Sequence, residues 1–340
     1  MTTALLVGNG FTSQLIPEYS NNYMMNLLRN QEPEICAQAE TLFSVFRSSS
    51  IVQSTQGNHY PNNIIIKRSI IKTLKRLSFK KSRRVFDTFF LEYSLIQECY
   101  HSQISSVESL LKVIALFKLI NRFSENEKNE IILAANRLYF NNGNNGLSAL
   151  SSKTQEAIRN FASTYSYIFT TNYDCIFDDA CKESDKVMHL HGGFYLKDRN
   201  HKSKEKLPPD KAYLIWGVNG EEKVQQLQGG LLVDRDHMFM VDNTGRLIYT
   251  QSTLGLYLHK LETQCIDQLD IFGYSGENDQ HINLTISKNT NIKRVNYFCD
   301  PYDVNNPGKN AKIRKQFSLS DDVQLSLLSW KEVWDRIPLC

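Results

Sequence analysis

Short apolar runs that end abruptly in polar or glycine residues constrain the fold of this chain more than any other feature. The run Tyr165 to Thr170 is followed at once by Thr171-Asn172-Tyr173-Asp174, and the run Val187 to Leu190 by His191-Gly192-Gly193. Runs bounded in this way are typical of buried strands. Because ligands of open α/β sheets bind at the carboxyl ends of the strands, we expect an Asn, an Asp and a His together at such an edge.

Further runs of the same kind extend the pattern. One of them ends in Gly8-Asn9-Gly10-Phe11, and another ends in Gly273-Tyr274-Ser275-Gly276. Because strands alternate with helical segments, the sequence predicts an α/β fold with a doubly wound, Rossmann-like parallel sheet. The additional strands are expected at Ala4–Val7, Leu269–Gly273, Ile292–Phe298 and Val323–Leu328, with a short strand at Ala212–Trp216 and a small hairpin within Leu231–Tyr249.

The long block between the first two strands of the predicted sheet has the period of amphipathic helices. We therefore predict an α/β domain formed by residues 1–30 plus 160–340, and a large, mainly helical insertion or cap subdomain over residues 31–159. The first helix is expected from about Asn21 to Arg29, after the glycine turn. Within the insertion, helices are expected at Ala37–Phe46, Ile70–Leu77, Val85–Cys99, Val107–Phe123 and Glu127–Tyr139, with a loop at Ser48–Asn63 and a break at Asn141–Gly146.

A basic segment from Lys67 to Arg84 contains many Lys and Arg residues and no acid. Such a segment permits direct nucleic-acid binding. We favour a solvated or protein-contact surface instead, because no platform of aromatic side chains interleaves the basic ones.

Composition narrows the class of protein. The chain has 340 residues, 41% of them hydrophobic, and a net charge of +3, which is too small to imply a polyanionic partner by itself. No apolar run approaches the roughly 18 residues that cross a membrane, so no membrane contact is expected. The 7 cysteines are scattered without any C-x-x-C pair, which argues against a zinc ribbon or a disulfide framework and favours the cytoplasm.

Each polar strand end has an ordinary explanation by itself, such as a turn former, a helix cap or a buried histidine. Their joint occurrence in this order resembles the sirtuin superfamily, and more closely its bacterial sirtuin-like members of phage-defence systems. The GNGF segment near the start of the chain (Gly8 to Phe11) and the GYSGENDQHI segment also resemble the abortive-infection H-type proteins. The segments that carry the resemblance are Gly8-Asn9-Gly10, Pro17-Glu18-Tyr19-Ser20, Thr170-Thr171-Asn172-Tyr173-Asp174, His191-Gly192 and Gly273-Tyr274-Ser275.

The resemblance implies an NAD hydrolase that depletes NAD in anti-phage defence as part of a larger assembly. It makes Asn172 and His191 the catalytic residues: the first would orient the ribose and the attacking water, and the second would be the base. It also assigns Asp174 to the nicotinamide carboxamide. The remaining contacts to NAD are expected from Gly8, Asn9, Gly10, Phe11, Thr171, Gly273 and Ser275.

Two departures from the sirtuin pattern bear on the reaction. Sirtuin deacylases hold a structural zinc through paired cysteines that this chain lacks, and the Arg of their first motif is Ser20 here. Both changes disfavour protein deacylation, so NAD is expected as a substrate, with no zinc and no other metal. A sirtuin-like deacylase and a catalytically silent nucleotide-binding regulator remain alternatives.

Uncontrolled NAD cleavage would harm the host cell, so we expect control by assembly. The resemblance implies a homo-oligomer and a partner such as a HerA-type hexameric ATPase or another defence protein. The helical block over residues 31–159 is the expected contact. The sequence leaves open whether the product is ADP-ribose or a cyclised form.

Overall fold

A computed structural model gives the architecture of the chain. It describes residues 1–47, 104, 106–118, 122–143, 146–181, 186–193, 195–197, 204–206, 213–214, 240–241, 247–248, 253–276 and 279–337. The basic segment, the predicted loop at residues 48–63 and the helices predicted at residues 70–77 and 85–99 lie outside this part of the chain. Within it, no helix is both long and apolar enough to cross a membrane.

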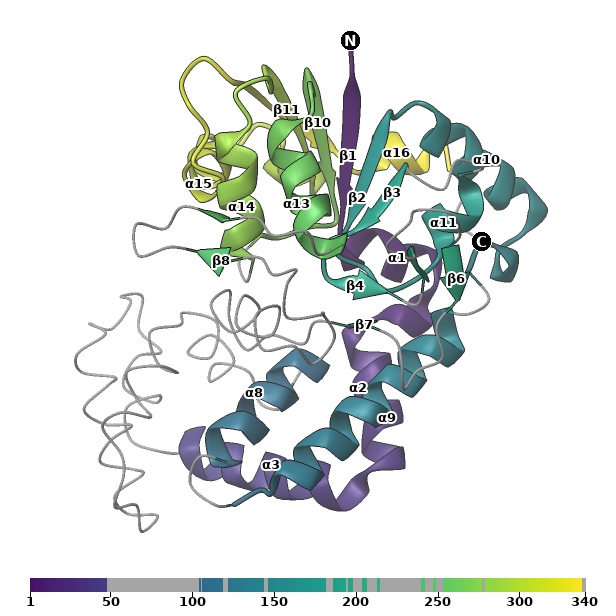
Figure 1. Cartoon of the computed structure of the whole chain (residues 1–340), viewed down its shortest axis with the longest axis vertical. Coiled ribbons are helices and arrows are strands. Elements are labelled where there is room, and N and C mark those ends of the chain that lie inside the picture. The colour runs from purple at the N-terminus through teal and green to yellow at the C-terminus, as the bar shows by residue number, and fades with distance from the viewer. Residues whose placement is uncertain are drawn as a thin grey trace. The chain divides into compact units, whose positions relative to one another are not determined.

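A sheet of six parallel strands, in the order β12-β11-β10-β1-β2-β3, forms the centre of the fold (Figure 1). In the central register, Val7 lies opposite Phe272 on one side and Thr170 on the other. All six strands were expected from their apolar runs, with differences of one or two residues at the ends. The strands are β1 (Thr3–Val7), β2 (Tyr167–Thr170), β3 (Val187–His189), β10 (Gln268–Phe272), β11 (Arg294–Cys299) and β12 (Gln324–Ser329).

The strand order confirms the predicted doubly wound, Rossmann-like sheet. The chain builds outward from β1 through β2 to β3, and then returns to the other side of β1 to build β10, β11 and β12. The direction of winding therefore reverses between β1 and β10. At such a reversal the helices that follow the two strands lie on opposite faces of the sheet, and ligands of open α/β sheets bind at the carboxyl ends of these strands.

Two apolar layers cover the sheet, one on each face. Successive residues of a strand point to opposite faces, so Leu6 packs with one layer and Leu5 with the other, and both are fully buried. The first layer includes residues of α13 (Thr253–Thr263), α14 (Gln280–Lys288) and α15 (Pro307–Gln316). The second includes residues of α1 (Asn9–Leu15), α10 (Ser152–Ser163), α11 (Ile176–Ala180) and α16 (Lys331–Trp334).

Short antiparallel pairs follow the third strand. β4 (Gly192–Gly193) pairs with β7 (Tyr213–Leu214), and β5 (Tyr195–Lys197) pairs with β6 (Lys204–Lys206). β8 (Met240–Val241) pairs with β9 (Leu247–Ile248), where a small hairpin was predicted.

The helix predicted from about Asn21 to Arg29 is confirmed as α2 (Asn21–Gln31), but a further helix before it was not predicted. α1 starts at Asn9, inside the glycine turn, whereas the prediction left this segment without a helix until about Asn21. Glycine costs about 1 kcal/mol in a helix relative to alanine, so local propensity argued against this start. The fully buried Phe11 outweighs that cost, because its ring packs 5.1 Å from Phe177 and 5.2 Å from Trp334.

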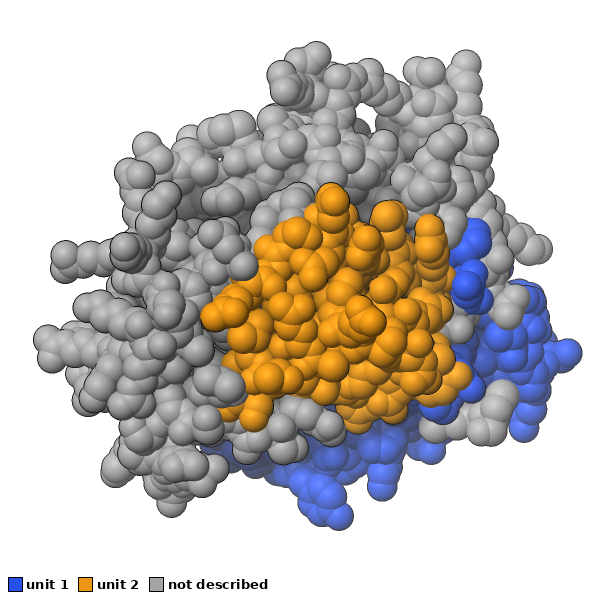
Figure 2. All heavy atoms as spheres, turned by 90° about the horizontal axis from the view of Figure 1, so that it is seen from below, with its two compact units in different colours: residues 1–20, 139–340 blue, residues 21–138 orange. Residues whose placement is uncertain are grey.

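The chain divides into two compact units, which Figure 2 colours separately. Unit 1 comprises Met1–Ser20 and Tyr139–Cys340, and unit 2 comprises Asn21–Leu138. Unit 2 contains α2 (Asn21–Gln31), α3 (Pro33–Arg47), α8 (Val107–Lys118) and most of α9 (Glu125–Gly143). Inside it, Arg29 pairs with Glu40 at 2.7 Å and donates to the carbonyl of Ile104. The predicted helical insertion had the bounds 31–159, whereas this division places α2 in unit 2 and α10 in unit 1.

Candidate functional site

The turn after β1 and the turn after β10 are joined through glycines. The N–H of Gly8 donates to the carbonyl of Phe272, and the N–H of Gly10 donates to the carbonyl of Gly273, both at 3.0 Å. A Cβ on Gly8 would lie 2.5 Å from the carbonyl oxygen of Gly273, and one on Gly273 would lie 2.3 Å from the amide nitrogen of Phe11. Gly273 also has a φ of +65°, which favours glycine. These positions need glycine because two backbones touch there.

This contact changes what the predicted nucleotide-binding residues can offer. The N–H groups of Gly8 and Gly10 are already engaged within the chain, so neither is left as a donor for a pyrophosphate. Phe11 is a core residue with no exposed surface. Asn9 and Thr171 are half-buried beside the turn, and the N–H of Thr171 donates to the carbonyl of Val7. The exposed Ser275, whose carbonyl accepts from the side chain of Gln316, stands at the surface of the other turn.

Asn172, Thr12 and Asp174 form one buried hydrogen-bonded chain at this edge. The Nδ2 of Asn172 donates to the hydroxyl of Thr12 at 2.8 Å and to the carbonyl of Gly8 at 3.2 Å. The hydroxyl of Thr12 in turn donates to a carboxylate oxygen of Asp174 at 2.7 Å. Because a carbonyl can only accept, the contact with Gly8 fixes which end of the Asn172 amide is nitrogen.

The side-chain oxygen of Asn172 is buried and has no hydrogen-bond partner among the described residues. Another buried asparagine, Asn289, shows the ordinary structural arrangement: its Nδ2 donates to the carbonyls of Leu261 and Gln264, and its oxygen accepts from the N–H of Asn291. Nearly all buried polar groups are paired, because an unpaired one costs about 1–3 kcal/mol. The unpaired oxygen of Asn172 is therefore an acceptor with capacity for a ligand.

Asp174 supports this chain from inside the protein. One carboxylate oxygen accepts from Thr12, and the other accepts from the N–H of Ile176 at 3.0 Å. Burial raises the pKa of the Asp174 carboxyl, while these two hydrogen bonds oppose the rise. With both oxygens occupied, the carboxyl fixes Thr12 and through it the amide of Asn172.

A second histidine, which the sequence prediction did not assign to the site, holds the backbone of Asn172. The Nδ1 of His189 lies 2.8 Å from the carbonyl oxygen of Asn172, and its Nε2 lies 2.7 Å from Oδ2 of Asp178. Both partners are acceptors, so the arrangement is that of an imidazolium with a carboxylate. The two side chains are only 3% and 4% exposed. A Cβ on Gly193 would lie 3.0 Å from the same ring, which explains a glycine there.

Removing this histidine is expected to destabilise the fold. His189→Leu leaves the carboxylate of Asp178 buried without its cation, which costs about 3 kcal/mol of unfolding free energy. Denaturant unfolding followed by circular dichroism measures the loss. The double variant His189→Leu/Asp178→Leu removes both charges and is expected to recover most of it. Equal losses in the single and double variants would contradict the ion pair.

His191 lies in a different group of side chains, with Asp279 and His281. Its Nε2 is 3.1 Å from Oδ1 of Asp279, but the approach lacks hydrogen-bond geometry, and within the described part of the chain this buried nitrogen has no hydrogen-bond partner. Its ring centre is 5.6 Å from that of His281. The three residues are 4%, 9% and 5% exposed. The sequence prediction included His191 but gave no role to the other two, although both lie in the quoted GYSGENDQHI segment.

Tyr19 adds another buried polar atom in unit 1. Its hydroxyl has no hydrogen-bond partner in the described ranges of the chain, and the residue is only 2% exposed. Burial raises the pKa of this hydroxyl far above its ordinary value, and the charge of Asp174 adds to the rise. The tyrosine therefore stays neutral and can donate a hydrogen bond. Its place in the Pro17-Glu18-Tyr19-Ser20 segment was the signal that could have identified it.

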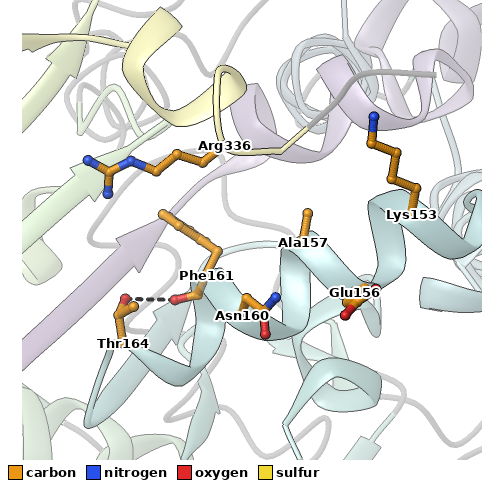
Figure 3. A pocket seen from close by; sticks show the side chains of 7 residues that line it. All are labelled: Lys153, Glu156, Ala157, Asn160, Phe161, Thr164 and Arg336. Carbon is orange, nitrogen blue, oxygen red and sulfur yellow. Dashed lines mark hydrogen bonds between the residues drawn. The ribbon is translucent and has the colours of Figure 1, made fainter.

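A surface groove elsewhere in unit 1 is unrelated to these residues. It has a volume of about 410 Å³ and runs along the outside of α10, where Lys153, Asn160 and Arg336 line it (Figure 3). These three residues are exposed. No residue that lines the groove belongs to the strand ends, so the groove is not part of the candidate site.

The fold and these residues define an α/β protein with a polar group at the edge where winding reverses. Comparisons with protein-family models, curated proteins and solved structures found no match for the chain.

Proposed function

We propose that this protein is an NAD glycohydrolase that converts NAD and water into nicotinamide and ADP-ribose. One observation carries the proposal: the residues predicted to be catalytic, Asn172 and His191, each present a buried polar atom that makes no hydrogen bond with the residues that the structure describes. Support also comes from the strand order, since the reversal between β1 and β10 is where nucleotides bind in sheets of this type.

The reaction needs an acceptor and a base near the anomeric carbon of the ribose. The bond from this carbon to the nicotinamide nitrogen breaks, and its electron pair leaves with nicotinamide. An oxocarbenium-like centre develops, as in other glycosidic cleavages, and the oxygen of water bonds to it. The Oδ1 of Asn172 would accept a hydrogen bond from this water or from a ribose hydroxyl. The ring of His191 would take the proton that the water loses.

Asp174 takes a supporting role in this scheme. Its two oxygens already accept from Thr12 and Ile176, so it positions Asn172 in place of the carboxamide contact implied by the resemblance. The imidazolium of His189 secures the same segment through the carbonyl of Asn172. An amide fixed at its nitrogen end and at its backbone is oriented before the substrate arrives, which lowers the entropic part of the barrier.

Nicotinamide release from NAD tests the proposal. The purified chain, with any assembly partner that proves necessary, is incubated with NAD, and free nicotinamide is measured by chromatography. His191→Ala is expected to lower the rate by about 100-fold, because a general base contributes on this order. His259→Ala, which removes an exposed histidine on α13, is the matched control and is expected to keep the rate.

The outcomes separate the alternatives. Equal rates for the wild type and His191→Ala would show that the assignment of the base is wrong. NAD binding without nicotinamide release would favour the silent nucleotide-binding regulator. Removal of the acetyl group from an acetyl-lysine peptide would favour the deacylase.

A further inference from the structure

We propose that His191, Asp279 and His281 form a binding site for a divalent transition-metal cation such as Zn²⁺. Each of the three offers one ligand atom, and these atoms all lie within 4.8 Å of one another. All three residues are buried. Two imidazoles and a carboxylate are a common protein ligand set for zinc.

The carboxylate of Asp279 faces the histidines instead of its own helix. Asp279 is the N-cap residue of α14, a position where an aspartate commonly accepts a hydrogen bond from the first turn of the helix. No such bond is made here, and Oδ1 lies 3.1 Å from Nε2 of His191. His281 is the second residue of the same helix, so a single helix start supplies two of the three ligands.

The unpaired nitrogen of His191 points to a ligand independently of the cluster. An imidazole nitrogen that carries no proton has a lone pair, and Nε2 of His191 is buried without a hydrogen bond to any described residue despite the nearby carboxylate. Had the pair been an ordinary histidine–aspartate hydrogen bond, this nitrogen would have been satisfied. A cation between the two groups would accept the lone pair and offset the buried negative charge.

The dimensions and the ligand types favour a small, nitrogen-preferring ion. Ligand atoms about 2.0 Å from a tetrahedral zinc lie roughly 3.3 Å apart, so side-chain movements that together amount to about 1.5 Å would close a pair separated by 4.8 Å. Imidazole ligands suit Zn²⁺, Co²⁺ and Ni²⁺, whereas Mg²⁺ and Ca²⁺ prefer oxygen alone. Three protein ligands leave a further coordination position for water.

Metal binding would regulate the proposed reaction, and this consequence rests on the proposed function. The ion takes the lone pair of His191 that would otherwise accept the proton of water. The metal-loaded protein is therefore inactive toward NAD, and release of the ion frees the base. Saturating Zn²⁺ is expected to lower nicotinamide release at least tenfold, with recovery after chelation. Unchanged release at full occupancy would overturn this regulatory role.

Binding itself is measured without NAD, so its outcome is separate from that of the proposed function. The tag-free full chain is treated with a chelator, dialysed and titrated with Co²⁺ while the visible absorption of the metal is recorded, and then with Zn²⁺ by calorimetry. One equivalent of Co²⁺ is expected to give ligand-field bands without the sulfur charge-transfer band that cysteine ligands produce, and one equivalent of Zn²⁺ is expected to displace it.

Two variants locate the site. Asp279→Asn keeps the shape of the side chain, and His281→Ala removes a ring; each is expected to weaken binding by at least about 100-fold. His259→Ala is expected to bind like the wild type. The absence of one-equivalent binding by the wild type, or unchanged binding in both folded variants, would overturn the proposal.

Discussion

Replacing Asn172 with alanine is expected to lower the rate of nicotinamide release by about 1000-fold. The substitution removes the unpaired Oδ1 that would orient the water or the ribose. It also removes the Nδ2 that donates to Thr12 and Gly8, so the neighbouring turns lose a fixed contact. Both losses act on the same reacting centre, which is why the effect is expected to exceed that of His191→Ala.

The difficulty with this variant is that a buried asparagine also stabilises the fold. Its removal leaves the carbonyl of Gly8 without the side-chain donor, at a cost of about 1–3 kcal/mol. Asn289→Ala is the matched control, because this asparagine also joins two groups through Nδ2 and is likewise buried. It precedes β11 and so lies at the opposite edge of the sheet from the strand ends.

The pair separates catalysis from stability. Both variants are expected to shift the denaturation midpoint by similar amounts, measured by denaturant unfolding. Only Asn172→Ala is expected to lose nicotinamide release, measured at a temperature where both are folded. Thr12→Val breaks the same hydrogen-bonded chain while leaving Oδ1 in place, and about a tenfold loss is expected from it. Full activity in Asn172→Ala, or equal losses in it and Asn289→Ala, would remove Asn172 from the mechanism.

The strands of the sheet could be predicted from the sequence because each strand is marked by its own residues and by those that directly follow it. A parallel strand buried on both faces is an apolar run, and a run such as Ala4 to Val7 ends visibly in a glycine. The same rule predicted that Asn172, Asp174 and His191 meet at one edge. The hydroxyl of Thr12 joins the first two, whereas His191 lies with Asp279 and His281. What the pattern could not supply was Thr12, since its helix was not predicted.

Contacts between distant segments were beyond the reach of the local pattern. Gly8 and Gly273 meet although they are far apart in the sequence, and each glycine alone is compatible with either a ligand contact or an ordinary turn. His189 is separated from Asp178 by a segment with no distinctive spacing, so nothing marked it as different from His191. Only the three-dimensional structure shows that both ring nitrogens of His189 have partners, whereas Nε2 of His191 has none among the described residues.

Replacing Gly273 with alanine is expected to destabilise the fold by about 4 kcal/mol or more. The left-handed backbone, with a φ of +65°, costs about 1–3 kcal/mol for a residue with a side chain. The new Cβ would also lie 2.3 Å from the amide nitrogen of Phe11 and 2.7 Å from the carbonyl carbon of Gly10. Both atoms belong to backbone that cannot rotate away, and overpacking of this kind adds about 1–3 kcal/mol.

Gly308→Ala is the control for this prediction. Gly308 lies in the first turn of α15 without a positive φ, and the closest neighbour of an added Cβ is the side-chain oxygen of Asn306 at 3.3 Å. Alanine also favours a helix by about 1 kcal/mol over glycine, so a small change of either sign is expected. Denaturant unfolding of both variants measures the difference.

The result decides what the glycines of the two turns do. If they serve a nucleotide alone, Gly273→Ala should weaken NAD binding and leave stability near that of Gly308→Ala. If the glycines instead let two backbones touch, as the hydrogen bonds from Gly8 and Gly10 to the β10 turn indicate, Gly273→Ala should be much less stable than Gly308→Ala. Separation of the two turns would also move Gly8 away from Asn172. The folded fraction of Gly273→Ala should therefore release less nicotinamide than the wild type. A stable Gly273→Ala variant with full activity would contradict this account of the site.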